Sequence, residues 1–412
     1  MREVLRNASF TKLFTAQVIA LVGTGLLTVA LGLLAFDLAG EQAGLVLGTA
    51  LTIKMLAYVG VAPLVSAITH KVPRKTLLVG ADLVRASIAA WLPFVDQVWH
   101  IYALIFVLQA ASATFTPAFQ AVIPEILPEE LQYTRALSLS RLAYDLEALL
   151  SPMIAAALLT LVSYHDLFLG TVAGFLGSAL LVLVTRFPTI AHDAGTPFGE
   201  RLTRGVRVFA RSDQLRSLLA MNLTVACATA MVLVNTVVLV RGTLERPDAD
   251  VAVLLAAYGA GSMIMALALP RTLDRTPDRG VMLTGNTVLP LGLVGAAALI
   301  ALAPHAWAAL LLMWFVLGAA TSTVLTPSAR LLRRASTRAN RSAVFAAQFS
   351  LSHACFIVTY PLAGSLGAQL GLPTIALVLA GIAAAAAVLA HVAWKRRSDG
   401  ALEPFATLRE PG

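Results

Sequence analysis

Apolar residues run through this chain in twelve long stretches, each bounded by short polar or charged segments. An α-helix of about 20 mostly apolar residues crosses the roughly 30 Å of hydrocarbon in a bilayer. The pattern therefore predicts twelve membrane-spanning helices. We place them at residues 12–36, 44–69, 76–94, 100–121, 134–162, 166–186, 217–241, 251–271, 281–303, 306–328, 342–369 and 372–394.

The two halves of this pattern resemble each other at an offset of about 209 positions. Residues 108–118 read LQAASATFTPA, and residues 317–329 read LGAATSTVLTPSA. Duplicated six-helix units are typical of transporters, because two similar bundles can rock around a site at their interface. We predict an all-α integral membrane protein of two pseudo-symmetric six-helix bundles. Its expected parts are the bundles at 1–186 and 215–394, a cytoplasmic central loop at 187–214 and a cytoplasmic tail at 395–412.

Composition supports a membrane protein and excludes a soluble globule. Hydrophobic residues make up 58% of the chain and charged residues 13%, with a mean hydropathy of +0.82. Soluble domains carry about 25% charged residues. Both cysteines lie inside expected spans, so no disulfide framework is indicated. We find no phosphate-binding Gly-x-x-x-x-Gly-Lys-[Ser/Thr] loop, so we expect no ATP, no cofactor and no enzymatic activity, and an ion gradient as the energy source.

Positive charge indicates the orientation in the membrane. The decisive cationic runs lie in alternate connections, whereas Arg241 and Arg246 lie on the other side and Lys54 lies within a span. Cytoplasmic loops are enriched in Lys and Arg, so we expect an inner-membrane protein with both termini in the cytoplasm. This also explains the net charge of +8 without nucleic-acid binding. The basic stretch GERLTRGVRVFARSDQ in the central loop predicts an amphipathic helix at the membrane surface.

The fifth span carries the most candidate chemistry, because ionisable groups at bilayer depth cost several kcal/mol unless they pair or line water. Asp145 and Glu147 lie near its middle and point to different faces. Asp145 can form a structural ion pair with Arg141, four residues earlier. Glu147 has no such neighbour, and it either pairs with Lys54 of the second span or exchanges a proton for a substrate cation. These two interpretations are compatible, so Glu147, Asp145 and Lys54 are the proton-coupling candidates.

Polar groups in other spans are candidates for substrate binding. The repeat aligns His353 with Tyr144, so it is expected at a similar depth in the other half. An imidazole together with Glu147 or Asp145 suits a borderline transition metal, with Cys355 as a further ligand. The alternatives are a helix-to-helix hydrogen bond for the histidine and simple packing for the cysteine. Polar stripes on the first and fourth spans point to a cavity or to helix contacts; their members are Gln17, Thr24, Thr28, Gln109, Ser112, Thr116 and Gln120.

The tight basic turn after the second span resembles that of the major facilitator superfamily. The family turn reads Gly-x-x-x-Asp-Arg-x-Gly-Arg-Lys, and the same slots here are Ser66, His70, Lys71, Pro73, Arg74 and Lys75. The cations are kept, while the glycines and the acid are lost. The resemblance implies that Arg74 and Lys75 gate the cytoplasmic side with Asp82 or neighbouring acids. The remaining implied gating residues are Arg85 in the third span and Asp274 and Arg275 in the second copy of the turn.

Three stretches in the first half further resemble the nickel-resistance exporters of this superfamily. They are FTAQVIALVGTGLLTVALGLLAFDLAG, LGTALTIKMLAYVGVAP and YTRALSLSRLAYDLEALLSPM. The resemblance implies export of a divalent metal cation such as nickel in exchange for protons, although the tail lacks the histidines that such exporters can carry. The alternative substrate is a drug-like or siderophore-like organic molecule, whose pocket would be mostly apolar. Expected partners are the substrate, protons and the lipid bilayer.

Overall fold

The chain forms a bundle of long helices that matches the expected spans closely. The structure, a computed structural model, describes residues 4–61, 72–127, 129–187, 198–273, 276–336 and 341–395, except for some side chains within helices. In these ranges the first half contains α1 (Ala8–Ala39), α2 (Ala43–Leu56), α4 (Arg74–Trp91), α5 (Val98–Ile126), α6 (Glu130–Leu158) and α7 (Tyr164–Leu183). The second half contains α9 (Asp213–Val237), α10 (Asp248–Leu273), α11 (Asp278–Leu302), α12 (Trp307–Arg334), α13 (Arg341–Leu370) and α14 (Leu372–Lys395). The predicted all-α membrane fold is confirmed.

Length and hydropathy make these helices suitable for a bilayer. Ten stretches of the described residues are long and apolar enough to cross a membrane, and one of them, Ala8–Gly60, contains both α1 and α2. The remaining long helix, α6, carries Glu147 near its middle. A π-helical segment extends α2 through Ala57–Val61, and another extends α9 through Val238–Thr243. Such segments allow a helix to continue with altered register, and they are frequent near functional sites.

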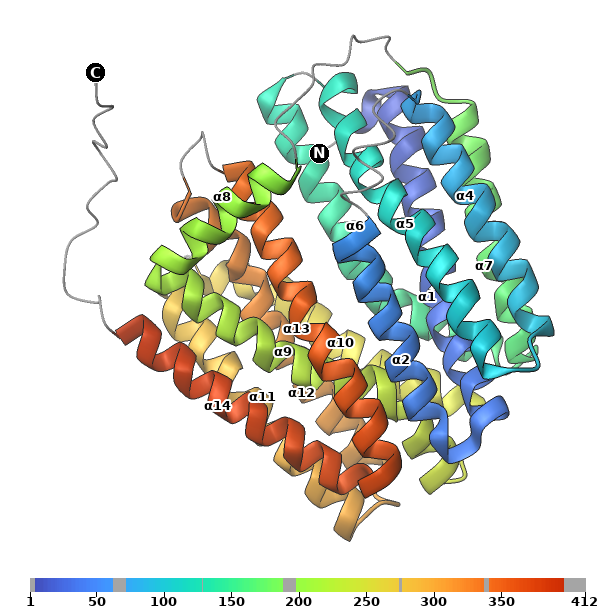
Figure 1. Ribbon diagram of the computed structural model, residues 1–412, viewed down its shortest axis with the longest axis vertical. Helices are drawn as coiled ribbons and strands as arrows, with labels where there is room; N and C mark the ends of the chain where they lie inside the picture. Colours follow the sequence, from blue (N-terminus) through green and yellow to red (C-terminus); the bar gives the residue numbers. More distant parts are fainter. Residues whose placement is uncertain are drawn as a thin grey trace.

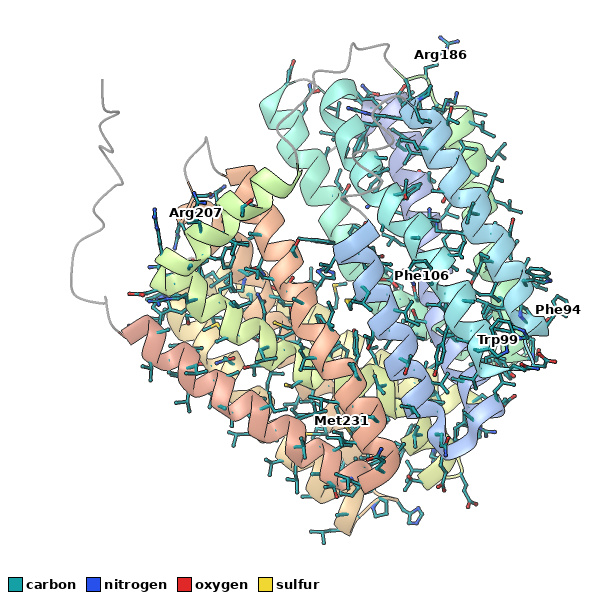
Figure 2. The ribbon with its side chains drawn as sticks, in the orientation of Figure 1. Phe94, Trp99, Phe106, Arg186, Arg207 and Met231 are labelled. Carbon is teal, nitrogen blue, oxygen red and sulfur yellow. The ribbon has the colours of Figure 1, made fainter. Side chains whose placement is uncertain are left out.

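Charge and aromatic residues distinguish the two ends of the bundle. Arg186 and Arg207 lie at the end where α1 begins, which we call the basic end, and Phe94 and Trp99 lie at the opposite end (Figure 2). Trp91, Phe94 and Trp99 are all largely exposed. Aromatic residues favour the interface between hydrocarbon and water. The exposed rings therefore indicate where one membrane surface meets the bundle.

The central connection contains the helix that the sequence indicated. Helix α8 (Phe198–Arg211) packs against α13 and α9 at the basic end, as seen in Figure 1. Phe209 is buried in the core, whereas Arg207 and Arg211 are exposed. This division of apolar and basic residues suits a surface helix. Its role as a membrane anchor stays a prediction, as do the expected domain boundaries.

The two halves meet through equivalent pairs of helices. Helix α2 packs against α13, and α6 packs against α10. Because α2 and α10 are the second long helices of their halves and α6 and α13 the fifth, each contact joins a second helix to a fifth helix. Figure 1 shows α2 and α13 side by side between the two groups. The repeat seen in the sequence thus produces an interface that occurs twice.

Glycines bring α2 and α13 into backbone contact at the opposite end. A β-carbon at Gly48 would lie 2.5 Å from the carbonyl oxygen of Tyr360 and 3.1 Å from the Cα of Gly364. A β-carbon at Gly364 would collide with the carbonyl oxygen of Gly44. The 3₁₀ turn Gly40–Gln42 of the first half also contacts the Val238–Thr243 segment of the second. The two halves are therefore closed against each other at this end.

We predict that Gly48→Ala destabilises this closed arrangement. The new methyl group has to displace backbone atoms of α13, and overpacking of this kind typically costs about 1–3 kcal/mol. Gly80→Ala is the matched control, because a β-carbon at Gly80 in α4 meets nothing within 4 Å. Thermal unfolding of both variants in one detergent measures the difference. Equal unfolding temperatures would show that the tight contact contributes nothing to stability.

Candidate functional site

A small cavity lies among helices of the first half, and Leu233 of α9 is its lining residue from the second half. It has a volume of about 30 Å³, which is enough for one or two water molecules. Most of its wall is aliphatic, and its polar groups come from the first half. The lining residues are Thr24, Leu27, Thr28 and Leu31 of α1, Leu47, Ala50, Leu51 and Lys54 of α2, Ile105 and Gln109 of α5, and Leu233 of α9. The polar stripes of the first and fourth spans thus contribute to one cavity.

Lys54 and Glu147 lie at the same depth in the bundle. Each is about eleven residues from the end of its helix at the opposite end, or roughly 16 Å at 1.5 Å per residue. Their charges attract each other, although among the described residues they form no direct ion pair. The ammonium group of Lys54 also lies 5.9 Å from the centre of the Tyr58 ring. The lysine and the acid thus lie at one depth and act on each other electrostatically, and their pairing stays a prediction.

Glu147 lies where α6 crosses α1. A β-carbon at Gly25 of α1 would lie 2.9 Å from Glu147 Oε1 and would overlap the side chain of Ser151. Only a glycine leaves room for both α6 side chains at this crossing. Ser151 is buried, and its hydroxyl oxygen has no hydrogen-bond partner in the part of the chain that the structure describes. The carboxyl group is therefore placed between two helices of the first half, next to an unsatisfied hydroxyl.

His353 reaches this region from the second half. Its ring lies 5.8 Å from Tyr58 and 4.1 Å from Phe349, between ring centres, and Tyr58 lies 6.3 Å from Phe349. His353 Nδ1 is 2.6 Å from the carbonyl oxygen of Phe349, so Nδ1 donates and Nε2 remains an acceptor. Lys54 is close enough to act electrostatically on His353. Tyr58 was not identified from the sequence, although its position four residues after Lys54 places both on one helix face.

The other predicted substrate residues are placed less closely together. Gln109 is buried and lines the cavity, and Tyr144 is exposed. Cys355 donates its thiol to the carbonyl of Leu351 in its own helix. The side chain of Asp145 lies outside the described residues, as does that of Arg141. Roles for these residues stay predictions.

The described residues contain no group of three or more His, Cys, Asp or Glu side chains that could hold a metal ion. The tentative metal set of His353, Glu147 and Asp145 therefore stays a prediction. Lys54 weighs against it, because its ammonium group acts on both His353 and Glu147. A divalent cation placed between them would have to overcome that positive charge.

The predicted gate residue Asp82 has different partners from those expected. Its carboxylate forms an ion pair with Arg85 and accepts a hydrogen bond of 2.7 Å from Ser178. The guanidinium of Arg85 stacks between Phe115 and Phe175, 4.3 and 4.5 Å from the ring centres. Asp82 is thus engaged inside the first half rather than with the cations of the turn.

The turn itself is described only in part. Lys75 donates to the carbonyl of Thr185 at 3.2 Å, and Arg74 begins α4. Residues 62–71 lie outside the described residues, as do Asp274 and Arg275 of the second copy. Gating by these residues stays a prediction.

The second half has an ion-pair cluster that the sequence did not reveal. Asp278, at the start of α11, lies 2.7 Å from Arg334 and 3.7 Å from Arg330, both near the end of α12. The sequence signal that could have indicated this cluster was Asp278 at a helix N-terminus, together with the basic residues at the end of α12. Because the partners are about 50 residues apart in sequence, only the fold brings them together.

Comparisons with known proteins agree with the fold. The model of the Major Facilitator Superfamily matches residues 13–286 and 218–410. Solved structures of similar shape include the nucleoside transporter NupG, with 13–14% identity, a TM-score of 0.73 and coverage of 94% of this chain and 100% of that chain. A bacterial homologue of the human lysosomal transporter Spinster has 12% identity, a TM-score of 0.73 and coverage of 94% and 96%. At such identities the likeness shows the fold alone.

Sequence relatives include named efflux proteins. Macrolide efflux protein A of Streptococcus pyogenes is 24% identical over 218 residues, covering 51% of this chain and 53% of the relative. The corresponding protein of Enterococcus faecalis is 26% identical over 186 residues, covering 42% and 57%. The MFS-type transporter YfiS of Bacillus subtilis is 24% identical over 281 residues, or 66% of each chain. The chain therefore matches only about half the length of the macrolide efflux proteins.

We predict that Asp82→Asn strongly destabilises the first half. The change leaves the buried guanidinium of Arg85 without its counter-charge, and breaking a buried ion pair costs about 3–5 kcal/mol. Asp213→Asn is the matched control, because Asp213 and Arg216 form a pair with the same spacing that is much more exposed. Exposed pairs contribute about 0–1 kcal/mol. Unfolding midpoints in detergent measure both losses, and equal losses would contradict a structural role for the buried pair.

Proposed function

The chain belongs to the major facilitator superfamily, and on this premise we propose that it exports a drug-like organic molecule in exchange for protons. The observation that carries the substrate proposal is the cavity, whose wall is mostly leucine and isoleucine with a few polar groups. Pockets for organic molecules typically have this composition. The sequence relatives named for macrolide efflux support the direction of transport and the substrate class. The cavity has to enlarge to accept such a molecule, which movement of the two halves allows.

Export of a divalent metal such as nickel is the second candidate. It is supported by Nε2 of His353, an acceptor that has no hydrogen-bond partner among the described residues and lies within electrostatic range of Lys54. Imidazole nitrogen is a common ligand of such metals. The ammonium group of Lys54 and the aliphatic cavity wall favour the organic molecule instead.

Proton coupling is assigned to Glu147. Its carboxyl lies at mid-depth, is shielded by α1, and has Lys54 as its opposite charge without a direct ion pair among the described residues. Burial disfavours a lone negative charge, so the group can alternate between a carboxylate that interacts with Lys54 and a neutral acid. A group that exchanges its proton when the halves move can couple transport to a proton gradient.

The proposed orientation places the basic end in the cytoplasm of the cell and the opposite end outside the inner membrane. Both termini are then cytoplasmic. In this orientation the glycine contacts between α2 and α13 lie on the outer side, and contact at that side supports the proposal of an inward-facing conformation. An exporter loads its substrate in this conformation.

Glu147→Gln should abolish gradient-driven export while leaving binding largely intact, because glutamine keeps the shape and hydrogen bonding of the acid but cannot titrate. The assay measures accumulation of a macrolide by everted membrane vesicles whose lumen is acidified. Wild type should accumulate the compound and Glu147→Gln should not. Glu41→Gln, at an exposed position of the 3₁₀ turn, is the control and should remain active.

Two results of this assay would reject parts of the proposal. Full accumulation by Glu147→Gln would remove Glu147 from proton coupling. Accumulation of nickel ions without accumulation of any macrolide or hydrophobic dye would replace the organic substrate by the metal, and His353→Ala should then weaken nickel binding.

A topology assay tests the proposed orientation. A reporter fused after Arg338 should report the cytoplasm, and one fused after Arg246 should report the outer side of the membrane. Green fluorescent protein and alkaline phosphatase, which are active on different sides, provide the two readouts. Both fusions on one side would contradict the arrangement of the twelve helices, and an exchange of the two sides would reverse the orientation.

A further inference from the structure

We propose that Cys227 of α9 and Cys355 of α13 form a buried two-thiol site in the second half, and that this site binds a soft metal ion such as Hg²⁺. The chain has two cysteines, and both are free thiols. Neither of them lines the cavity of the first half. The metal site is therefore separate from the cavity to which substrate binding is assigned.

The register between α9 and α13 places the two thiols at the same depth. Both helices begin at the basic end and pack against each other, so they run in the same direction (Figure 1). The side-chain amide of Asn235 in α9 donates a hydrogen bond of 3.3 Å to the carbonyl oxygen of Ala363 in α13. Asn235 and Ala363 are 128 positions apart, and so are Cys227 and Cys355. The same offset on two parallel helices puts both thiols at one level.

Rows of residues spaced by four bring the thiols to the same helix contact, because helices pack through such rows. The row on α9 is Cys227, Met231 and Asn235, and the row on α13 is Cys355, Thr359, Ala363 and Gly367. Asn235 contacts this second row at two places: it bonds to Ala363, and a β-carbon at Gly367 would lie 2.9 Å from Asn235 Oδ1. Two steps back along each row, the two cysteines lie opposite each other. They are also close enough to act on each other electrostatically.

A hydroxyl group in the same contact has no partner. Thr359 follows Cys355 by one helical turn and is fully buried, as is Cys227. The hydroxyl oxygen of Thr359 forms no hydrogen bond within the described ranges. A buried polar group without a partner is unfavourable, so its presence calls for an explanation. A sulfur atom bound to a metal could accept the hydrogen bond that Thr359 does not otherwise donate.

Two thiols in this position select a soft ion by charge and by coordination number. Binding of Hg²⁺ forms two Hg–S bonds and releases both thiol protons, so the complex is neutral and suits an apolar interior. Thiolates favour soft ions, and Hg²⁺ is satisfied by two of them in a linear arrangement. Zinc requires four ligands, and the described residues contain no group of three or more His, Cys, Asp or Glu side chains that could hold a metal ion. The site should therefore bind Hg²⁺ and reject Zn²⁺ and Ni²⁺.

A bound ion would tie α9 to α13. Both helices reach the boundary between the halves, because α13 meets α2 at Gly364 and α9 contributes Leu233 to the cavity. A ligand that binds the folded protein raises its resistance to unfolding. Occupancy by Hg²⁺ should therefore raise the unfolding temperature of the wild-type protein.

The experiment measures how much Hg²⁺ the purified full-length protein retains during dialysis against excess glutathione, which removes ions held by a single thiol. Wild type should retain one ion per chain. Cys227→Ala and Cys355→Ala should each retain none, because each leaves a single thiol. Met221→Leu, which removes another buried sulfur atom from α9, is the matched control and should retain the ion as wild type does. Ni²⁺ offered in the same way should be retained by none of these forms.

Each outcome decides the proposal. Retention by either cysteine variant, or of two ions by wild type, would show that the thiols act independently and would overturn it, as would loss of the ion from wild type. If a cysteine variant does not fold, X-ray absorption at the mercury edge of the dialysed wild type still decides. Two sulfur neighbours without bound glutathione in the mass spectrum support the site. One protein sulfur completed by glutathione contradicts it.

Discussion

A charge inside the hydrocarbon region has to find its opposite charge within the protein, and this constraint organises the described interior of the molecule. Asp82 and Arg85 meet it by direct contact within one helix, whereas Asp278 pairs with Arg334 where α11 begins and α12 ends, outside the expected spans. Lys54 and Glu147 meet it at longer range, and Lys54 lines the cavity. The directly bonded pairs hold their halves together. Lys54 and Glu147 form no direct ion pair among the described residues, so no bond has to break when they move apart. We therefore expect their interaction to change during transport.

The duplication produces two similar helix bundles, but their ionisable residues differ. The contact between a second and a fifth helix occurs twice, as α2 with α13 and as α6 with α10. The first half provides both Lys54 and Glu147, whereas α10 contains no lysine and α13 contains no acidic residue. The second half contributes Phe349 and His353 instead. The proposed proton coupling therefore rests on residues of one half, although the two bundles are similar.

The sequence predicted the helices well because hydropathy over about 20 residues is a local property. Predicted spans such as 281–303 and 372–394 agree closely with α11 and α14. The similar depth of Lys54 and Glu147 could also be predicted from the sequence, because depth follows from the position of a residue within its span. Contacts that depend on how helices cross could not be predicted from the sequence. The stacking of Arg85 between Phe115 and Phe175, and the fit of Glu147 against Gly25, depend on helix crossings that hydropathy does not specify.

In the proposed mechanism, the transported molecule and a proton on Glu147 are exchanged for each other. The most direct measurement is the proton balance of binding, recorded with a pH indicator when a macrolide is added to purified protein in weakly buffered solution. The account predicts that binding releases protons from wild type and that the release disappears in Glu147→Gln. Proton uptake on binding, or release that is unchanged in Glu147→Gln, would contradict it.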